Sequence, residues 1–308
     1  MSGKPTHSTL ITLTMLISGM ALFGSATPVS RIIGQDFPVL LAAELRVLIG
    51  TLVLLPVAIG HFGTVPRLSR ADWMRIAIIA LFGMFGFTLL MLYGMRLIPG
   101  AAGAVVMSTA PAITAIGAIA FLGDRLTRAK ALAIGLAVIG VLTLNLLSAG
   151  ESGGLLLWGS LLVLAAVCCE AVYTLMGRRT TETVSPVLVA FLAAALSIPL
   201  FAPFALWQAW GWDWTTVSAA SWVALVWYGA GTLALGSWVW YAGVSRASGS
   251  TAAGFMAVMP CSALLLSYLL LDEPFRWSHI AGFAIVLVSV LLMSREHAKM
   301  GQESERDS

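Results

Sequence analysis

Long apolar stretches separated by short polar loops run along almost the whole chain of 308 residues. A helix needs about 20 consecutive apolar residues to cross a hydrocarbon layer about 30 Å thick. Ten stretches of about that length occur, and each predicts a membrane-spanning helix. They cover residues 9–33, 38–59, 73–97, 100–122, 128–147, 155–176, 186–207, 221–244, 249–271 and 279–293. We therefore expect an all-α integral membrane protein with ten transmembrane helices.

One of these stretches occurs twice. The segment 100–126 (GAAGAVVMSTAPAITAIGAIAFLGDRL) returns about 149 residues later as segment 249–275 (GSTAAGFMAVMPCSALLLSYLLLDEPF), and Pro111 aligns with Pro260. Both copies carry small residues at every fourth position, which lets helix backbones approach closely in lipid. The duplication predicts two five-helix units, residues 1–150 and 151–294. A polar cytoplasmic tail, residues 295–308, follows them.

Each predicted unit contains five spans, which is an odd number, so the second unit enters the membrane from the opposite side. Similar sequence with opposite orientation is an inverted repeat. Transporters use inverted repeats to expose one site near the middle of the membrane to each side in turn. The pattern therefore favours a transporter that works by alternating access.

The distribution of basic residues predicts the orientation. If both termini lie in the cytoplasm, the outer loops contain only Arg31, Arg96 and Arg276, and nearly all other Lys and Arg residues fall inside. This asymmetry agrees with the positive-inside rule. We expect a multi-pass protein of the bacterial cytoplasmic (inner) membrane. Cleavage of residues 9–33 as a signal peptide is the alternative, but it would leave nine spans and break the repeat.

The composition excludes several classes of protein. The chain is 59% hydrophobic and 10% charged, so no soluble domain fits beside the spans. The net charge of +3 comes from loops on one side and does not indicate nucleic-acid binding. Cys168, Cys169 and Cys261 fall inside apolar spans and are expected to be small buried thiols. We expect no catalytic residues, no metal and no cofactor, and without a Walker loop we expect no direct use of ATP.

Two segments resemble a known family. The run 93–144 has a span ending in a short turn, a span with a central proline, an acidic turn and a glycine-spaced span. This pattern resembles the EamA-type domain of the drug/metabolite transporter superfamily, and the run 241–293 resembles a second copy. The second copy differs at its acidic turn, residues 272–274. The resemblance implies ten helices, of which the first four of each unit enclose a central path and the fifth lies at the periphery.

Three ionisable residues fall inside predicted spans, where each charge is costly and needs a reason. Glu44 and Arg46 are two positions apart, so they point about 200° apart on a helix and do not pair directly. For Arg46, two interpretations are open: a clamp on a neighbouring helix end, or binding of a substrate carboxylate. Glu170 is either hydrogen-bonded to a neighbouring helix or senses protons or substrate. The second interpretation predicts that Glu170→Gln alters the pH dependence of transport.

Aromatic residues mark a candidate binding face. Trp227, Trp238 and Tyr241 recur at helical spacing, Tyr93 occupies the position of Tyr241 in the first copy, and Tyr173 lies in the span of Glu170. A face of Trp and Tyr with few charges suits a planar, partly apolar substrate, and a cation can also dock on it. The alternative is that these rings are ordinary core or face the lipid.

Repeat-related methionines and prolines complete the set of candidates. Met107 and Met256 precede the two aligned prolines and are either adaptable walls of a binding cavity or filler. Pro111, Pro260 and Pro28 lie within spans, where proline bends a helix. They are candidate hinges, with a static kink as the alternative.

Together these features predict a secondary transporter. The resemblance to the aromatic amino-acid exporters of the family favours export of amino acids or amphipathic metabolites, with protons as a possible second partner. A multidrug-type exporter of organic cations is the first alternative. A non-transporting membrane or lipid-handling protein with the same fold is the second. A carrier of phosphates or nucleotide sugars would need several basic residues along its path, and only Arg46 is present.

Overall fold

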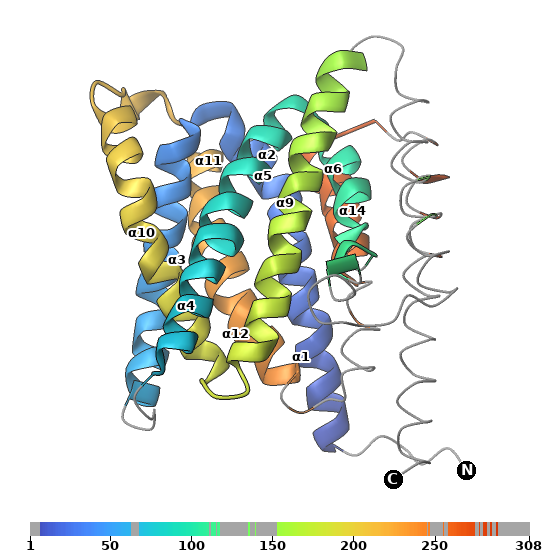
Figure 1. Cartoon of the computed structure of the whole chain (residues 1–308). Coiled ribbons are helices and arrows are strands. Elements are labelled where there is room, and N and C mark those ends of the chain that lie inside the picture. The colour runs from blue at the N-terminus through green and yellow to red at the C-terminus, as the bar shows by residue number, and fades with distance from the viewer. Residues whose placement is uncertain are drawn as a thin grey trace.

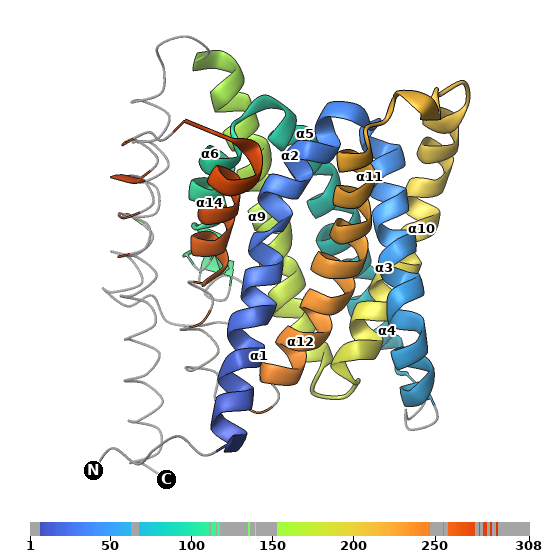
Figure 2. The same ribbon diagram turned by 180° about the vertical axis from the view of Figure 1, so that it is seen from behind.

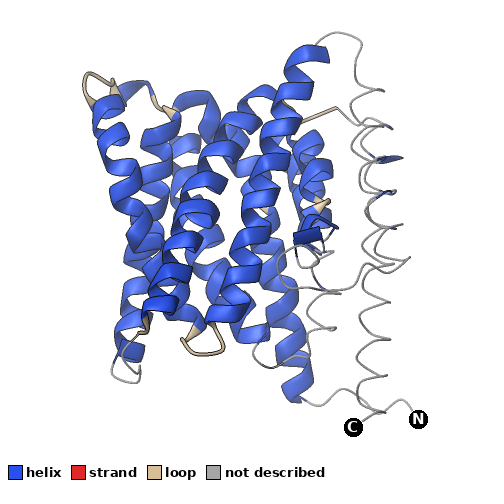
Figure 3. Ribbon diagram, viewed as in Figure 1, coloured by secondary structure: helices blue, strands red, loops and turns tan. Residues whose placement is uncertain are grey.

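A computed structural model describes the protein at residues 7–62, 68–110, 112–114, 116–117, 153–244 and 258–274, and at a few single positions. Those single positions are residues 135, 139, 246, 255, 277, 280, 281, 284 and 288. Every regular element among the described residues is a helix (Figure 3). The all-helical fold that the apolar pattern predicts is therefore confirmed.

The described helices follow the predicted spans closely. In chain order they are α1 His7–Gly24, α2 Ala26–Asp36, α3 Val39–Phe62, α4 Arg70–Ile78, η1 Ile79–Gly86, α5 Phe87–Leu97, α6 Gly100–Met107, α9 Gly153–Thr180, α10 Pro186–Ala209, η2 Trp214–Thr216, α11 Ala219–Val226, η3 Trp227–Leu235, α12 Gly236–Val244 and α14 Val258–Leu271. Several are consecutive pieces of one longer helix.

Six helical stretches of the described chain are long and apolar enough to cross a membrane. They are Leu10–Asp36, Val39–His61, Arg70–Leu97, Gly154–Gly177, Pro186–Ala209 and Ala219–Gly243. Two shorter apolar helices, Gly100–Thr114 and Val258–Leu271, fall in two further predicted spans. The predicted spans 128–147 and 279–293 and the tail 295–308 lie outside the described residues, apart from a few single positions. The chain is thus a multi-pass membrane protein.

Two of the long spans contain a π-helical segment in the middle. In the first, η1 joins α4 to α5, and in the second, η3 joins α11 to α12. A π-helical turn inserts an extra residue into the α-helical register, and such segments are frequent at functional sites. Glycines occur in and beside both segments, so the backbone is locally soft and few side chains resist the wider turn.

Helices from the two parts of the chain run in opposite directions and pack against one another. In Figure 1, α1 and α2 run up the view while α9 runs down, and α3 runs down while α10 runs up. The packed pairs include α3 with α10, α5 with α9, α1 with α12 and α6 with α14. The reverse view in Figure 2 shows α1 beside α12, with α14 next to α1.

Glycines permit the closest of these approaches. A Cβ atom added to Gly94 of α5 or to Gly159 of α9 would lie 3.1 Å from the carbonyl oxygen of the other glycine. In the α1–α12 pair, a Cβ on Gly19 would lie 2.8 Å from the Cα of Trp240. Backbones in these pairs are therefore in direct contact, as expected where packing rather than the hydrophobic effect holds helices together in lipid.

Carboxylates cap the first turns of the two π-containing spans. At α4, Ser69 and Asp72 form a capping box, and Thr183, just after α9, donates to Asp72 Oδ1 at 3.1 Å. At α11, Ser218 is the N-cap, and Asp36 at the end of α2 accepts hydrogen bonds from the hydroxyls of Ser218 (2.5 Å) and Ser221 (2.7 Å). Each cap thus also ties the span to a helix from the other part of the chain.

Two arginines hold the ends of α2 and α5 together. Arg31 Nη1 donates to the carbonyl oxygens of Met95 and Arg96 at 2.8 Å, and Arg96 donates to the carbonyls of Gly34 and Phe37. Each guanidinium therefore neutralises the free carbonyls at the C-terminal end of the other helix. We call this pair the arginine clamp.

Candidate functional site

Arg46 lies inside the bundle, on α3. Its side chain is 6% exposed, and its Nη1 donates a short hydrogen bond to Thr88 Oγ1 of α5. The guanidinium carbon lies 4.3 Å from the centre of the Tyr228 ring and 5.9 Å from that of Phe87. Its Nε has no hydrogen-bond partner, and no carboxylate of the described residues lies within 4.0 Å of the guanidinium. Arg46 is therefore a buried cation without a counter-charge among the residues that the structure describes.

Tyr228 comes to Arg46 from η3. Its side chain is completely buried, and its hydroxyl has no hydrogen-bond partner among the described residues. The next residue, Gly229, allows this approach: a Cβ there would lie 2.8 Å from the Arg46 carbonyl oxygen and 2.7 Å from Ile49 Cβ. The π-helical segment and its glycine thus place an aromatic ring directly against the buried cation.

Two further tyrosines meet on the neighbouring helices. The hydroxyl of Tyr241, on α12, donates to the hydroxyl of Tyr173, on α9, at 2.6 Å. Ser237 is within hydrogen-bonding reach of the same Tyr173 hydroxyl. Tyr173 packs on Gly83 of η1, where an added Cβ would lie 2.7 Å from the Cβ of the tyrosine. The first π-helical segment therefore makes room for Tyr173, and the second supplies Tyr228.

Glu170 lies one turn before Tyr173 on α9. Its Oε2 is inaccessible to solvent and has no hydrogen-bond partner among the described residues. Tyr173 lies within electrostatic range of both Glu170 and Arg46. Two ionisable side chains, each with a polar atom that has no hydrogen-bond partner among the described residues, thus lie near one tyrosine.

These residues form one group, which we call the interior polar cluster. It consists of Arg46, Thr88, Glu170, Tyr173, Tyr228 and Tyr241. Helices α3 and α5 from the N-terminal part supply two members, and α9, η3 and α12 supply the other four. Buried polar groups normally have hydrogen-bond partners, and an unpaired buried charge is costly. The cluster therefore offers free donors and a free acceptor to a polar ligand.

Glu44 lies on α3, but it is separate from this cluster. It is buried, and its Oε2 also lacks a hydrogen-bond partner among the described residues. The two-residue spacing turns its side chain away from that of Arg46, as the sequence predicts. No group of three His, Cys, Asp or Glu residues close enough to hold a metal ion occurs in the described chain.

The aromatic face expected on the α11–η3–α12 span differs from the observed arrangement. Trp227 is 43% exposed and Trp238 is 45% exposed, whereas Tyr228 and Tyr241 contact the interior cluster. The physical reason is η3, because its wider turns change the α-helical spacing on which the expected face depends. Tyr93 is 39% exposed, so the two repeat-related tyrosines have different environments.

The other candidates lie apart from the cluster. Met107 is buried at the end of α6 in a separate apolar core, and Met256 and Pro111 are outside the described residues. Pro28 lies in the first turn of α2, directly after the break at Ser25 that separates α1 from α2, and Pro260 is buried in α14. Substrate binding by these methionines and hinge motion at these prolines remain predictions.

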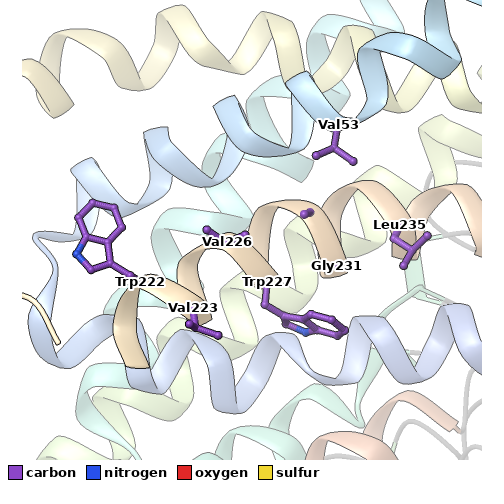
Figure 4. Close-up of a pocket in the computed structure, with 8 residues that line it drawn as sticks. Val53, Trp222, Val223, Val226, Trp227, Gly231 and Leu235 are labelled. Atoms are coloured by element: carbon purple, nitrogen blue, oxygen red, sulfur yellow. The ribbon is translucent and has the colours of Figure 1, made fainter. Parts of the chain in front are cut away.

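An apolar groove runs along the α11–η3–α12 span. It measures about 580 Å³ and is lined by Val53, Trp222, Val223, Val226, Trp227, Ala230, Gly231 and Leu235 (Figure 4). The Trp227 ring packs on Gly231, and its Nε1 donates to Ser25 Oγ at 2.9 Å. Six of the eight lining residues are exposed large apolar residues, namely Val53, Trp222, Val223, Val226, Trp227 and Leu235. This groove is distinct from the interior polar cluster.

Sequence analysis did not identify Thr88, Ser237 and Tyr228 as site residues. Tyr228 is adjacent to the predicted Trp227, and the glycines around it were the one available indication that the helix departs from regular α-helical spacing. Thr88 and Ser237 are ordinary hydroxyl residues inside apolar spans. Nothing in their local sequence distinguishes them from hydroxyls that bond their own helix.

Several known proteins are similar to this chain in sequence or in fold. A 30% identical relative, an uncharacterized transporter called YetK from Bacillus subtilis, aligns over 90% of this chain and 84% of its own. A "probable terminal-alkyne amino-acid exporter" from Streptantibioticus cattleyicolor is 24% identical over 91% of this chain and 92% of its own. One solved crystal structure matches with a TM-score of 0.61 over 94% of this chain and 96% of its own. At 20% identity this match shows the fold alone.

The family model of EamA-like transporters matches the chain twice, at residues 10–146 and 157–295. Together the two matches cover most of the sequence. The resemblance noted in the sequence is confirmed: the chain belongs to the EamA-like transporter family.

Proposed function

We propose that this protein is a secondary transporter that exports neutral amino acids, aromatic ones included, or amphipathic metabolites from a bacterium. The family is one of transporters, and one relative is named as an exporter of an amino acid. The protein would lie in the cytoplasmic membrane with both termini inside, because most basic residues then face the cytoplasm.

The proposed mechanism is alternating access between two inverted repeats, residues 1–150 and 151–294. Its support is the double family match and the opposite running directions of helices such as α3 and α10 (Figures 1 and 2). In transporters built this way the substrate lies between the repeats, near the middle of the membrane. Rocking of one repeat against the other would open the site to each side in turn.

The interior polar cluster is the observation on which this proposal rests most. Its members come from both repeats, and three of them, Arg46, Glu170 and Tyr228, carry polar atoms without partners among the described residues. A purely structural cluster would be expected to satisfy these groups internally, since each unpaired group costs stability. A transporter needs such groups free for its substrate. We also propose that protons couple to transport at Glu170.

Transport by purified protein in liposomes tests the proposal. We expect proteoliposomes loaded with an unlabelled neutral amino acid to accumulate the labelled form by counterflow, at a rate well above that of protein-free liposomes. The panel should contain aliphatic and aromatic amino acids and one quaternary amine. Accumulation no faster than in protein-free liposomes for every compound would contradict a transport function.

A second candidate function is export of organic cations. Glu170 favours it, because its carboxylate, unpartnered among the described residues, lies one turn before Tyr173, and a cation binds well to a carboxylate near aromatic rings. The charge of Arg46 opposes it, since the cation would lie near an unpaired guanidinium. The quaternary amine of the same panel distinguishes the two functions: exchange of the amine but of no amino acid would favour cation export.

A further inference from the structure

The interior polar cluster presents opposite charges at two separate places. Glu170 lies one turn before Tyr173 on α9, and Arg46 lies within electrostatic range of the same tyrosine. Neither charge has an ion-pair partner within 4.0 Å among the described residues. A basic and an acidic side chain, each with a polar atom unpartnered among the described residues, are complementary to a ligand that carries two opposite charges at a short distance.

Resting on the proposed transport function, we infer that the cluster binds the zwitterionic head group of a neutral α-amino acid. Arg46 and Tyr228 donate hydrogen bonds to the carboxylate of the amino acid, and Glu170 accepts hydrogen bonds from its ammonium group. The side chain of the amino acid packs against the neighbouring aromatic rings.

The donors around Arg46 suit a carboxylate. Thr88 occupies Nη1, which leaves Nε free, and the hydroxyl of Tyr228 is free as well. The ring of this tyrosine covers the guanidinium, with 4.3 Å between the guanidinium carbon and the ring centre. A carboxylate has two oxygens that accept several hydrogen bonds, and pairing with a guanidinium gives it both charge and geometric complementarity. Thr88 supplies only a neutral acceptor and leaves the charge of Arg46 uncompensated.

The carboxylate of Glu170 suits the ammonium group. Its free Oε2 lies one turn before Tyr173, whose hydroxyl is already bonded to Tyr241. The tyrosine pair is thus committed to its own hydrogen bond, and the carboxylate is the strongest acceptor available to a bound cation. The carboxylate of the ligand would compensate the charge of Arg46, and its ammonium group would compensate the charge of Glu170.

The surroundings favour a neutral side chain on the amino acid. The rings of Phe87 and Tyr228 lie near the Arg46 guanidinium, and Tyr173 and Tyr241 belong to the same cluster; such rings bind apolar and aromatic groups. Glu44, the other unpaired charge on α3, points away from Arg46 and is not available to a cationic side chain at the same place.

The first test uses the unaltered protein and three forms of one substrate. Counterflow of the amino acid transported fastest is inhibited by the amino acid itself, by its amide, which lacks the carboxylate, and by its N-acetyl form, which lacks the ammonium group. We expect each analogue to inhibit at least about 30-fold more weakly, because each leaves one buried charge of the site unpaired. Analogues that inhibit as well as the amino acid would overturn the inference and leave transport of amino acids standing.

The second test exchanges the charges one at a time. Arg46→Gln should abolish the preference for the amino acid over its amide but keep the preference for the amino acid over its N-acetyl form. Glu170→Gln should keep the first preference and abolish the second. A merely structural role would weaken all three ligands equally, and that outcome would overturn the inference. Thr51→Val is the matched control, because Thr51 also lies on α3 with an unpartnered hydroxyl but is outside the cluster. It should leave both preferences unchanged.

Two outcomes separate this inference from the proposed function. If no amino acid exchanges in the panel, the proposed export of amino acids fails and the inference fails with it. If amino acids exchange without discrimination against the analogues, only the inference fails. Should a charge variant not fold, the inhibition series with the unaltered protein decides alone.

Discussion

The α4–η1–α5 and α11–η3–α12 spans have the same architecture but different contents. In each, a capped α-helix leads into a π-helical segment and then into a second α-helix, and glycines admit a neighbouring helix. The second position of the π-helical segment is Ala80 in the first span and Tyr228 in the second. The first span therefore receives a ring, that of Tyr173 on Gly83, whereas the second span supplies one to Arg46.

This difference separates the features that build the scaffold from those that we propose to bind the ligand. Backbone features occur in both spans: the caps, the π-helical turns and the close glycine contacts. The side chains differ: Tyr228 has Ala80 at the matching position of the first π-helical segment, and Tyr241 of the cluster is related to Tyr93, which is exposed. In the proposed mechanism, the shared backbone features would provide the symmetry for movement, and the unequal side chains would provide one site instead of two.

The largest effect is expected at the glycine contact of the second span. In Gly229→Ala the added Cβ would lie 2.8 Å from the Arg46 carbonyl oxygen, a backbone atom that cannot rotate away. We expect a loss of about 1–3 kcal/mol in the free energy of unfolding, together with loss of transport. Thermal unfolding of the detergent-purified protein measures the first effect and counterflow the second.

Gly60→Ala is the control for that variant. Gly60 lies near the end of α3, and a Cβ added there would have no neighbouring atom within 4 Å. Alanine at this position should leave stability unchanged or raise it by up to about 1 kcal/mol, since it is the better helix former. Equal behaviour of the two variants would show that the close contact at Gly229 is not required.

Tyr228→Phe tests whether the second span supplies a binding group. The hydroxyl has no partner among the described residues, so its removal should not lower the thermal midpoint. If it donates to a substrate carboxylate, the KM for transport should rise about tenfold, because a hydrogen bond to a charged group is lost. A lower midpoint with an unchanged KM would assign the hydroxyl to structure.

The repeat-related tyrosines should respond differently to loss of their hydroxyls. Tyr241→Phe removes the 2.6 Å hydrogen bond to Tyr173, and we expect a cost of about 1 kcal/mol and slower transport. Tyr93→Phe alters a residue that is 39% exposed, and we expect a change within about 0.5 kcal/mol and normal transport. Thermal unfolding and counterflow, measured for both variants, test whether their losses of stability and transport differ. A comparable loss in Tyr93→Phe would mean that both spans contribute to function.

The smallest effects are expected at the caps of the two spans. Asp72→Ala removes the carboxylate of the capping box at α4 and its bond from Thr183, which should cost about 1 kcal/mol. Asp36→Ala leaves Ser218 in place as N-cap of α11 and should cost about 0.5 kcal/mol. The difference in thermal midpoint between the two variants measures the difference in these costs. A larger loss for Asp36→Ala would show that α11 depends more on its neighbour than on its own cap.

Sequence alone predicted the helical framework well. Apolar length fixes a membrane span independently of its partners, so the starts and ends of α3, of the α4–η1–α5 span and of α10 agree with the prediction within a few residues. Arg46, Glu170, Tyr173 and Tyr241 were also identified, because ionisable and polar aromatic residues are conspicuous inside apolar spans. What could not be predicted is which of them meet.

Two physical effects limited the prediction of the site. The π-helical turns of η3 change the spacing along that span, so Tyr228 faces Arg46 while its neighbour Trp227 is exposed. Thr88 is a partner of Arg46 only because α3 and α5 pack together, and that contact depends on the tertiary arrangement. Local periodicity contains neither kind of information.

The arginine clamp has a practical consequence for observing this protein at work. Because Arg31 and Arg96 each bind the end of the other's helix, α2 and α5 should move as one body. A spectroscopic label on this pair would then provide a stationary reference. Changes in distance from it to a second label near Ser218 would report any separation of α11 from α2, which the proposed alternating-access mechanism would require when one entrance opens.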